Sequence, residues 1–379
     1  MDMSNSSCRF GLTWAFMLLM ETGTICAQQL DWTFVDETRG GREIAVDFRH
    51  PIPLESPVNL IVVGHGFAMQ AADYDDLAAD LVEHGWAVAL VKTESNLSPS
   101  HADFGLDLAY VANHASSELD SGALAGLLGE HTAIVGHSMG GGAAWLASDA
   151  AEESIRTWVG LAPAETNPSA QEAAANIDMP VLVISGTADA VTPPEMHHIP
   201  LFEAATNSPC KALIHLNNAG HCGFADEGTL CDLGELFFNG MSRLDHQMHT
   251  RELLILWLEW HLESTADNAL ALQAYVDGQL DVEMTLQCSE TSVKERSFPT
   301  QSLAIHPNPA HQEVQLKRWD GQPLGILQCF DSRGDLVPLP SLPVDSHQLV
   351  IQVRQWPAGI YTFHSIQESS IQTGRLVVY

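Results

Sequence analysis

The five residues Gly136-His137-Ser138-Met139-Gly140 constrain the fold of this chain more than any other feature of the sequence. They follow a short apolar run at residues 133–135 and precede a Gly- and Ala-rich stretch typical of a helix. A sharp turn from strand to helix needs residues without side chains on both sides, so that the serine hydroxyl projects above the sheet. The pattern therefore predicts a serine nucleophile at the carboxyl end of a buried strand.

Short apolar runs alternate with helical stretches over most of the chain. The runs expected to form buried strands are residues 59–63, 87–91, 133–135, 157–161, 181–184 and 212–216. The stretches expected to form helices include residues 74–83, 106–117, 141–150, 195–205 and 250–262. An expected hairpin at residues 31–51, turning at Arg39-Gly40-Gly41, precedes them. This order predicts an α/β fold with a mostly parallel sheet, helices on both faces and an antiparallel start.

The character of the chain changes near Pro299. Of the 48 acidic and 16 basic residues, only 6 and 5 lie from Pro299 onward, so the net charge of −32 belongs almost wholly to the first part. Such a negative surface argues against nucleic acid and anionic lipid as partners. The rest of the chain alternates short strands with Pro, Gly and Asp, which predicts a small all-β sandwich. Its expected strands are residues 303–306, 314–317, 327–330, 349–353, 360–365 and 371–378.

The amino-terminal residues are typical of a secretory signal peptide. Arg9 precedes an apolar run at residues 10–20, and Ile25-Cys26-Ala27 is an acceptable cleavage site before Gln28. No other segment is a candidate membrane span. We therefore expect a signal peptide at 1–27, a catalytic domain at 28–290, a linker at 291–300 and the sandwich at 301–379.

Five cysteines remain after this cleavage. Four lie in the acidic part, an even number that favours two disulfides in an exported protein; they are Cys210, Cys222, Cys231 and Cys288. The sequence does not determine their connectivity, but we favour Cys222–Cys231 and Cys210–Cys288, with Cys329 left over. A zinc site is the alternative, and the chain has no Cys-x-x-Cys pair to support it.

A serine nucleophile needs a base, and the base needs an acid to orient it. Asp189 follows the expected strand at 181–184, and His221 follows the expected strand at 212–216, in the order that hydrolases of this type use. Asp189 has an alternative interpretation as a turn residue before Thr192-Pro193-Pro194, with Glu165 then the acid. His221 has an alternative interpretation as a solvated loop histidine.

A tetrahedral intermediate needs backbone N–H donors. We expect one from Met139, directly after the serine, and one from Phe67 in the loop Gly64-His65-Gly66-Phe67. The Phe67 side chain has two interpretations: its ring lines the pocket for the acyl group, or it only packs against neighbouring residues. The pair His197-His198 is not expected to bind metal, because adjacent helical residues point apart. No cofactor is expected.

Residues 29–288 resemble α/β-hydrolases of the dienelactone hydrolase, chlorophyllase and cutinase-like polyester hydrolase group. The resemblance rests on four segments: residues 64–67, 136–142, 186–189 and 220–224. It implies ester hydrolysis by Ser138, His221 and Asp189. Related polyester hydrolases often carry a tryptophan that clamps an aromatic substrate where this chain has Ala162-Pro163-Ala164. Residues 225–249 resemble an insertion that could roof the site.

The tail resembles the C-terminal sorting domain of the type IX secretion system of Bacteroidetes. The segments that carry the resemblance are residues 305–310, 331–334, 357–361 and 374–378. It implies export across the outer membrane by that machinery, to the medium or the cell surface. A carbohydrate-binding or adhesive sandwich is the alternative for this segment.

Three functions are compatible with these features. The first is a secreted serine esterase, acting on a small or polymeric ester. The second is a serine peptidase or thioesterase on the same scaffold. The third is a surface binding protein without catalysis.

Overall fold

The computed structural model divides the chain into two compact units, which are residues 1–276 with 281–292, and residues 277–280 with 293–379. In the first part of the chain it describes residues 6–7, 26–52, 57–121, 124–227, 230–235, 238–263 and 267–289. In the second it describes residues 303–306, 310, 312–318, 322–330, 337–339, 346–354, 356–357, 359–367 and 370–378. The expected linker and most of the expected signal peptide lie outside these residues, as do parts of the tail segments that resemble the sorting domain.

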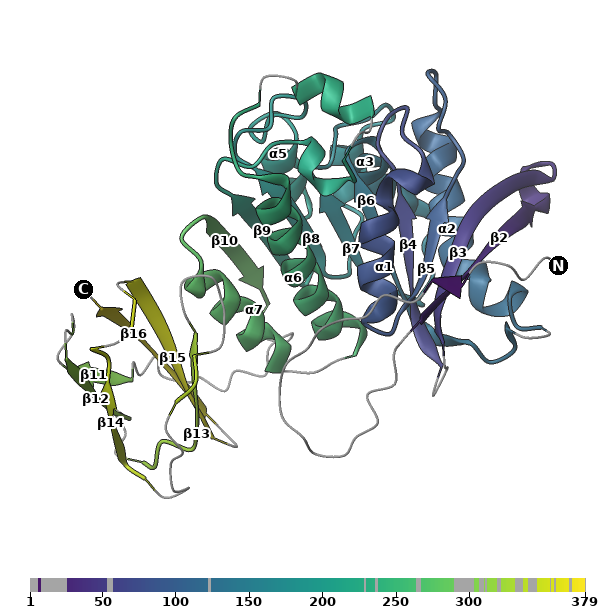
Figure 1. Cartoon of the computed structure of the whole chain (residues 1–379). Helices are drawn as coiled ribbons and strands as arrows, with labels where there is room; N and C mark the ends of the chain where they lie inside the picture. Colours follow the sequence, from purple (N-terminus) through teal and green to yellow (C-terminus); the bar gives the residue numbers. More distant parts are fainter. Residues whose placement is uncertain are drawn as a thin grey trace. The chain divides into compact units, whose positions relative to one another are not determined.

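A single twisted sheet forms the frame of the first unit (Figure 1). Within the described residues it has ten strands in the order β1-β2-β3-β5-β4-β6-β7-β8-β9-β10. Strands β4 to β9 are mutually parallel, whereas β1, β2, β3 and β10 pair antiparallel at the two edges. The strands are β1 (Ser6–Ser7), β2 (Cys26–Asp36), β3 (Arg42–Ile52), β4 (Val58–Gly64), β5 (Ala87–Val91), β6 (Leu128–His137), β7 (Ile155–Leu161), β8 (Val181–Gly186), β9 (Cys210–Leu216) and β10 (Val282–Cys288).

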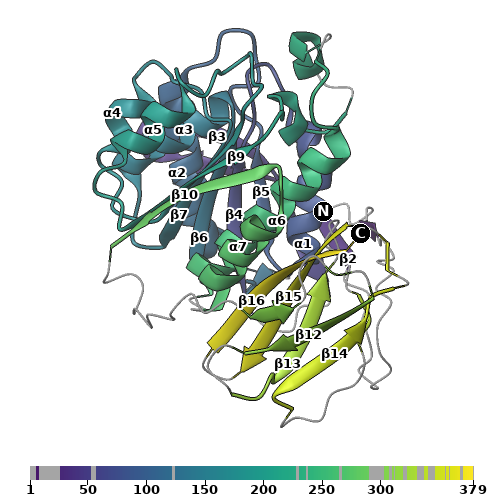
Figure 2. The same ribbon diagram turned by 90° about the vertical axis from the view of Figure 1, so that its left-hand side faces the viewer.

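Helices cover both faces of this sheet (Figure 2). One face packs against α2 (His101–Glu118), α3 (Met139–Leu146), α4 (Ala170–Ala174) and α5 (His198–Ala204). The other packs against α1 (Asp75–Glu83), α6 (Arg243–Leu262) and α7 (Asp267–Gly278). Because both faces are covered, the central strands are buried throughout, as in β5, where all five residues are buried. The predicted α/β-hydrolase architecture is confirmed.

The second unit contains two three-stranded antiparallel sheets among its described residues. One consists of β11 (Ala304–His306), β12 (Glu313–Lys317) and β14 (Gln348–Gln352), and the other of β13 (Ile326–Phe330), β15 (Gly359–Gln367) and β16 (Ser370–Val378). Strands β12 and β14 alternate buried with exposed residues. Their buried side chains share a core with Phe363 and Leu376 of the other sheet, as the all-β prediction requires.

Among the elements that differ from the sequence-based expectation are β10 and α6. Strand β10 was not predicted, because it lies at the edge of the sheet and exposes most of its residues instead of forming an apolar run. Helix α6 begins at Arg243 rather than Thr250, so the end of the expected insertion forms its first turns. Its buried residues there are His246 and His249, which interrupt the apolar pattern that identifies a helix.

Candidate active site

Ser138 occupies the turn between β6 and α3. Its backbone has φ 55° and ψ −119°, a left-handed conformation that is strained for a residue with a side chain. The turn is held by hydrogen bonds from Ser138 N–H to Leu161 O (3.0 Å) and from Ala164 N–H to Ser138 O (2.9 Å). A Cβ atom at Gly136 would lie 2.1 Å from the carbonyl oxygen of Gly140, so this close approach requires glycine.

Asp189 and His221 meet beside this turn, on the loops that follow the neighbouring strands β8 and β9. His221 Nδ1–H donates to Asp189 Oδ2 over 2.7 Å, and both side chains are almost wholly buried. The other carboxylate oxygen, Oδ1, accepts the backbone N–H groups of Val191 (2.8 Å) and Thr192 (2.7 Å). Burial by itself would raise the pKa of Asp189, but the bond from His221 and these other donors outweigh it, so the pKa is lowered.

Ser138 is 8 % exposed and lies at the surface end of this group. Its hydroxyl makes no hydrogen bond to His221 within the described residues. Serine–histidine contacts in ligand-free hydrolases often tighten only when substrate binds.

Two backbone N–H groups were expected to donate to an oxyanion, those of Met139 and Phe67. Met139 is the first residue of α3, where the helix dipole favours negative charge. Phe67 follows β4, in a loop fixed by bonds from Gly66 N–H to Tyr74 Oη (2.8 Å) and from Met69 N–H to Gly66 O (3.2 Å). Neither the Met139 nor the Phe67 N–H donates to an acceptor in the described part of the chain. Both are therefore available to a developing oxyanion.

His137 connects the oxyanion loop to the histidine loop. Tyr74 accepts from Gly66 and donates its hydroxyl proton to His137 Nδ1 over 2.8 Å. His137 Nε2–H in turn donates to the carbonyl oxygen of His221 over 3.1 Å, and the two rings lie 4.8 Å apart. Burial, aided by the neighbouring His221, holds the pKa of His137 well below its usual value, so the ring stays neutral.

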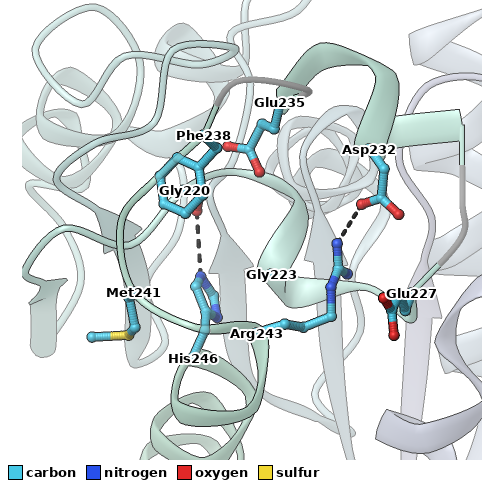
Figure 3. Close-up of a pocket in the computed structure, with 9 residues that line it drawn as sticks. All are labelled: Gly220, Gly223, Glu227, Asp232, Glu235, Phe238, Met241, Arg243 and His246. Atoms are coloured by element: carbon cyan, nitrogen blue, oxygen red, sulfur yellow. Dashed lines mark hydrogen bonds and ion pairs between the residues drawn. The ribbon is translucent and has the colours of Figure 1, made fainter.

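Glu235 lies beside Gly220, the residue before His221 (Figure 3). Its carboxylate accepts the N–H groups of His221 (2.5 Å) and Cys222 (3.0 Å). A Cβ atom at Gly220 would lie 2.3 Å from Glu235 Oε1, so the loop and the carboxylate are in close contact. Glu235 lies in η6 (Leu230–Glu235), within the segment expected as an insertion.

A cavity of about 230 Å³ lies beside this contact (Figure 3). In its wall, Arg243 forms an ion pair with Asp232 and donates to the carbonyl oxygens of Cys222 (2.7 Å) and Ala225 (2.6 Å). His246 donates to the carbonyl oxygen of Gly220 over 3.3 Å. The segment after His221 is therefore tied to its loop by polar contacts in addition to apolar packing.

The cysteines pair as Cys210–Cys288 and Cys222–Cys231, the connectivity favoured from the sequence. Cys210–Cys288 joins paired residues of β9 and β10. Cys222–Cys231 closes a loop that begins directly after His221. Cys329 is buried as a thiol in the second unit.

The alternative acid, Glu165, does not reach His221. Its carboxylate accepts the N–H of Gln171 near the start of α4 (3.0 Å), and its own N–H donates to His197 Nδ1 (2.9 Å). Among the described residues there is no group of three or more His, Cys, Asp or Glu side chains arranged to hold a metal ion. In the same residues, no helix is long and apolar enough to cross a membrane.

Sequence reasoning missed five side chains that contact Asp189, His221 or the loops next to Ser138 and His221: Tyr74, His137, Thr192, His198 and Glu235. His137 stands inside the serine motif, but the motif does not specify that position. Thr192 was considered only as part of a turn, and His198 only as a metal ligand. Glu235 carried no sequence signal, because its partners are backbone N–H groups brought to it by the fold.

Comparisons with known proteins identify similar sequences. The sequence pattern of one family, described as PETase, PET hydrolase-like, matches residues 47–250, more than half of the chain. Cutinase est1 of Thermobifida alba is 28% identical over 165 residues, which cover 42% of this chain and 52% of that protein. A bis(hydroxyethyl) terephthalate hydrolase of Streptomyces coelicolor is 26% identical over 166 residues, covering 42% and 49%. The match thus spans about half the length of each relative.

Proposed function

The chain belongs to the PET hydrolase-like family, and on this premise we propose that it is a serine hydrolase that cleaves carboxylic esters through an acyl-enzyme. The observation that carries the proposal is the buried 2.7 Å contact between Asp189 Oδ2 and His221 Nδ1, set beside the strained turn that presents Ser138. The names of the two relatives, a cutinase and a terephthalate ester hydrolase, support the same bond type.

The proposed reaction has two steps. Ser138 Oγ attacks the ester carbonyl carbon while its proton moves to His221 Nε2, and the oxyanion accepts the N–H groups of Met139 and Phe67. The intermediate collapses, and the alcohol leaves with the proton from His221. Water then gives a proton to His221 and attacks the acyl carbon. His221 returns this proton to Ser138 Oγ as the second intermediate collapses and the acid is released. Asp189 keeps the Nδ1 proton in place and stabilises the imidazolium.

The surroundings of the triad favour a bulky apolar substrate, and we extend the proposal to polymeric esters. Large apolar side chains on the loops after β4, β8 and β9 are unusually exposed; they are Phe67 (51%), Val191 (45%), Met196 (71%) and Leu233 (62%). These loops follow the carboxyl ends of parallel strands, which is also the edge of the sheet that carries the triad. Exposed apolar groups clustered around a site favour contact with an apolar surface.

The segment after β7 favours aliphatic over aromatic chains. Ala162-Pro163-Ala164 stands where related polyester hydrolases often have a clamping tryptophan. It also packs closely on the serine turn, since a Cβ atom at Gly142 would lie 2.2 Å from the carbonyl oxygen of Ala164. A substrate panel of short esters, triglycerides, aliphatic polyester film and terephthalate polyester film tests this preference directly.

We also propose that the protein is exported and that its second unit is a type IX sorting domain. The two disulfides support an oxidising destination. The antiparallel strands of the second unit form their own core, and the charge of the chain changes where that unit begins. In a host with this secretion system, removal of residues 293–379 should leave the protein in the periplasm, whereas the full chain leaves the cell.

Labelling with a fluorophosphonate tests the chemistry. The wild-type protein and Ser117→Ala, which changes an exposed serine on α2, should be labelled and should hydrolyse p-nitrophenyl butyrate. Ser138→Ala should be neither labelled nor active, with a kcat lower by several orders of magnitude. Turnover of amide substrates at a comparable rate would favour a peptidase, and faster turnover of thioesters a thioesterase. An unlabelled wild-type protein would leave the non-catalytic binding function.

A further inference from the structure

A second histidine, His198, lies behind the carboxylate of the triad. It is the first residue of α5 and is 0% exposed. Its Nδ1 lies 2.7 Å from the hydroxyl of Ser185, at the end of β8, and its Nε2 lies 3.0 Å from Thr192 Oγ1. Its Nε2 is also 3.8 Å from Asp189 Oδ2. A wholly buried imidazole therefore sits between two hydroxyl groups, one of which contacts the triad.

Thr192 Oγ1 is the centre of this cluster. It lies 2.9 Å from Asp189 Oδ2, 2.9 Å from His221 Nδ1 and 3.3 Å from the carbonyl oxygen of Ala162. The hydroxyl has one proton, and its shorter contact to an oxygen acceptor is the one to Asp189. When that proton points at Asp189, the neighbouring imidazole nitrogen His198 Nε2 can bond to Thr192 Oγ1 only as a donor.

The protons in the cluster are then determined step by step. His198 Nε2 carries a proton and donates it to Thr192, so Nδ1 of the neutral ring is an acceptor. The Ser185 hydroxyl donates to that Nδ1. The result is one directed chain, from Ser185 to His198 to Thr192 to Asp189, in which each donor meets an acceptor.

The surrounding groups keep His198 neutral. Burial lowers its pKa to about 3, and the nearby negative charge of Asp189 only partly offsets burial. Other titratable groups near the triad and His198 are His137, whose ring lies 4.8 Å from that of His221, and the histidines His197 and His215. Glu235 contacts only the backbone of the His221 loop. A second cation beside Asp189 is thus avoided, and the carboxylate charge remains available to His221.

We propose that His198 is a positioning residue of the triad that acts through Thr192. By donating to Thr192 Oγ1, His198 directs the Thr192 hydroxyl proton at Asp189. This bond fixes the carboxylate that orients His221. This inference rests on the proposed function, since it assigns His198 a role in the same reaction. Without the donor at His198, the Thr192 hydroxyl can turn toward the carbonyl oxygen of Ala162. Asp189 Oδ2 then accepts one hydrogen bond fewer, so the orientation of the Asp189 carboxylate is less well fixed.

The test compares two substitutions at the same position. His198→Phe keeps an aromatic ring but removes both ring nitrogens, whereas His198→Gln keeps an N–H that can donate to Thr192. His261→Phe is the matched control: it removes another imidazole whose pKa is lowered to about 3 by burial, on α6, with no bond to the triad. The assays are kcat and KM for p-nitrophenyl butyrate, the pH profile of kcat/KM, and the extent of fluorophosphonate labelling.

We expect His198→Phe to lower kcat about tenfold, with KM changed by less than about twofold, because the lost hydrogen bond acts on chemistry rather than on binding. The acidic limb of kcat/KM should move to higher pH, since the negative charge of the Asp189 carboxylate is then less shared with Thr192. His198→Gln should recover most of kcat and the original limb. His261→Phe should leave both unchanged.

Equal activity and equal pH profiles for wild type, His198→Phe and His198→Gln would overturn the proposal, as would equal losses in the Phe and Gln variants. If His198→Phe fails to fold, the ¹⁵N shifts of His198 in the wild-type protein decide instead. A neutral ring with its proton on Nε2 supports the chain of donors, and an Nδ1–H or doubly protonated ring contradicts it. If Ser138 in the wild-type protein is not labelled by fluorophosphonate, the proposed function fails, whereas labelled but unresponsive variants refute only the role of His198.

Discussion

Removal of the Glu235 carboxylate should impair catalysis without touching any group that contacts substrate. In Glu235→Ala, the backbone N–H groups of His221 and Cys222 both lose their acceptor. Hydrogen bonds to a charged acceptor typically contribute about 1.5–3 kcal/mol each when buried. Glu235 is only partly buried, and water can replace part of the contact. We therefore expect a loss of about 2 kcal/mol in the free energy of unfolding, and a Tm lower by about 5 °C.

The expected effect on kcat depends on the contacts that still hold the His221 loop in Glu235→Ala. The disulfide Cys222–Cys231 and the bond from Arg243 to the carbonyl oxygen of Cys222 remain, so His221 should shift by a fraction of an ångström. A displacement of about 1 Å can cost about a hundredfold in rate. We expect a kcat about tenfold lower, with KM nearly unchanged. Steady-state kinetics on p-nitrophenyl butyrate at 25 °C and thermal unfolding followed by circular dichroism measure the two effects.

Glu227→Ala is the matched control. Glu227 lies in the wall of the same cavity but is exposed, and no bond from it to the His221 loop is present in the described residues. Its removal changes the charge of the segment by the same amount. If Glu227→Ala lowers kcat as much as Glu235→Ala, the effect is electrostatic and the assignment of Glu235 as a support is wrong. An unchanged kcat in Glu235→Ala would refute it equally.

The remaining predictions concern the surroundings of the site. Burial and the charges of neighbouring acids raise the pKa of Asp226 from 3.8 to about 6, so its contribution to stability is present below pH 3.8 and lost as the pH rises through about 6. Asp226→Asn should therefore raise stability at pH 8 by about 1 kcal/mol, after allowance for solvent screening, and give no gain at pH 4 in thermal unfolding. Tyr74→Phe removes the hydrogen-bond partner of the Gly66 N–H and of His137 Nδ1. It should lower the free energy of unfolding by about 2 kcal/mol and kcat about tenfold. Mild reduction of Cys222–Cys231 should lower activity before far-UV circular dichroism changes, and four or more reactive thiols in the unreduced native protein would contradict the pairing. A chain ending at Ser289 should keep its Tm and its kcat/KM on soluble esters; loss of either would mean that the tail belongs to the catalytic unit.

The sequence by itself determined the class of fold and the positions most suited to the chemistry. Strands that are buried on both faces must be apolar along their whole length, so residues 87–91 and 181–184 identified β5 and β8 without other information. The serine turn needs glycine on both sides, so its position could be read directly from the sequence. Asp189 and His221 could be proposed because strand ends of a parallel sheet meet at one edge.

Tertiary structure alone decided how these groups are supported. His198, Thr192 and Glu235 act on partners brought to them by packing, two of which are backbone N–H groups that have no sequence signal. Edge strand β10 and the first turns of α6 escaped prediction because neither has an apolar pattern: β10 is mostly exposed, and the first turns of α6 bury histidines. The role of a residue can be predicted from the sequence when its own backbone conformation or hydrophobicity is constrained. When the constraint comes from a partner distant in sequence, only the folded chain reveals it.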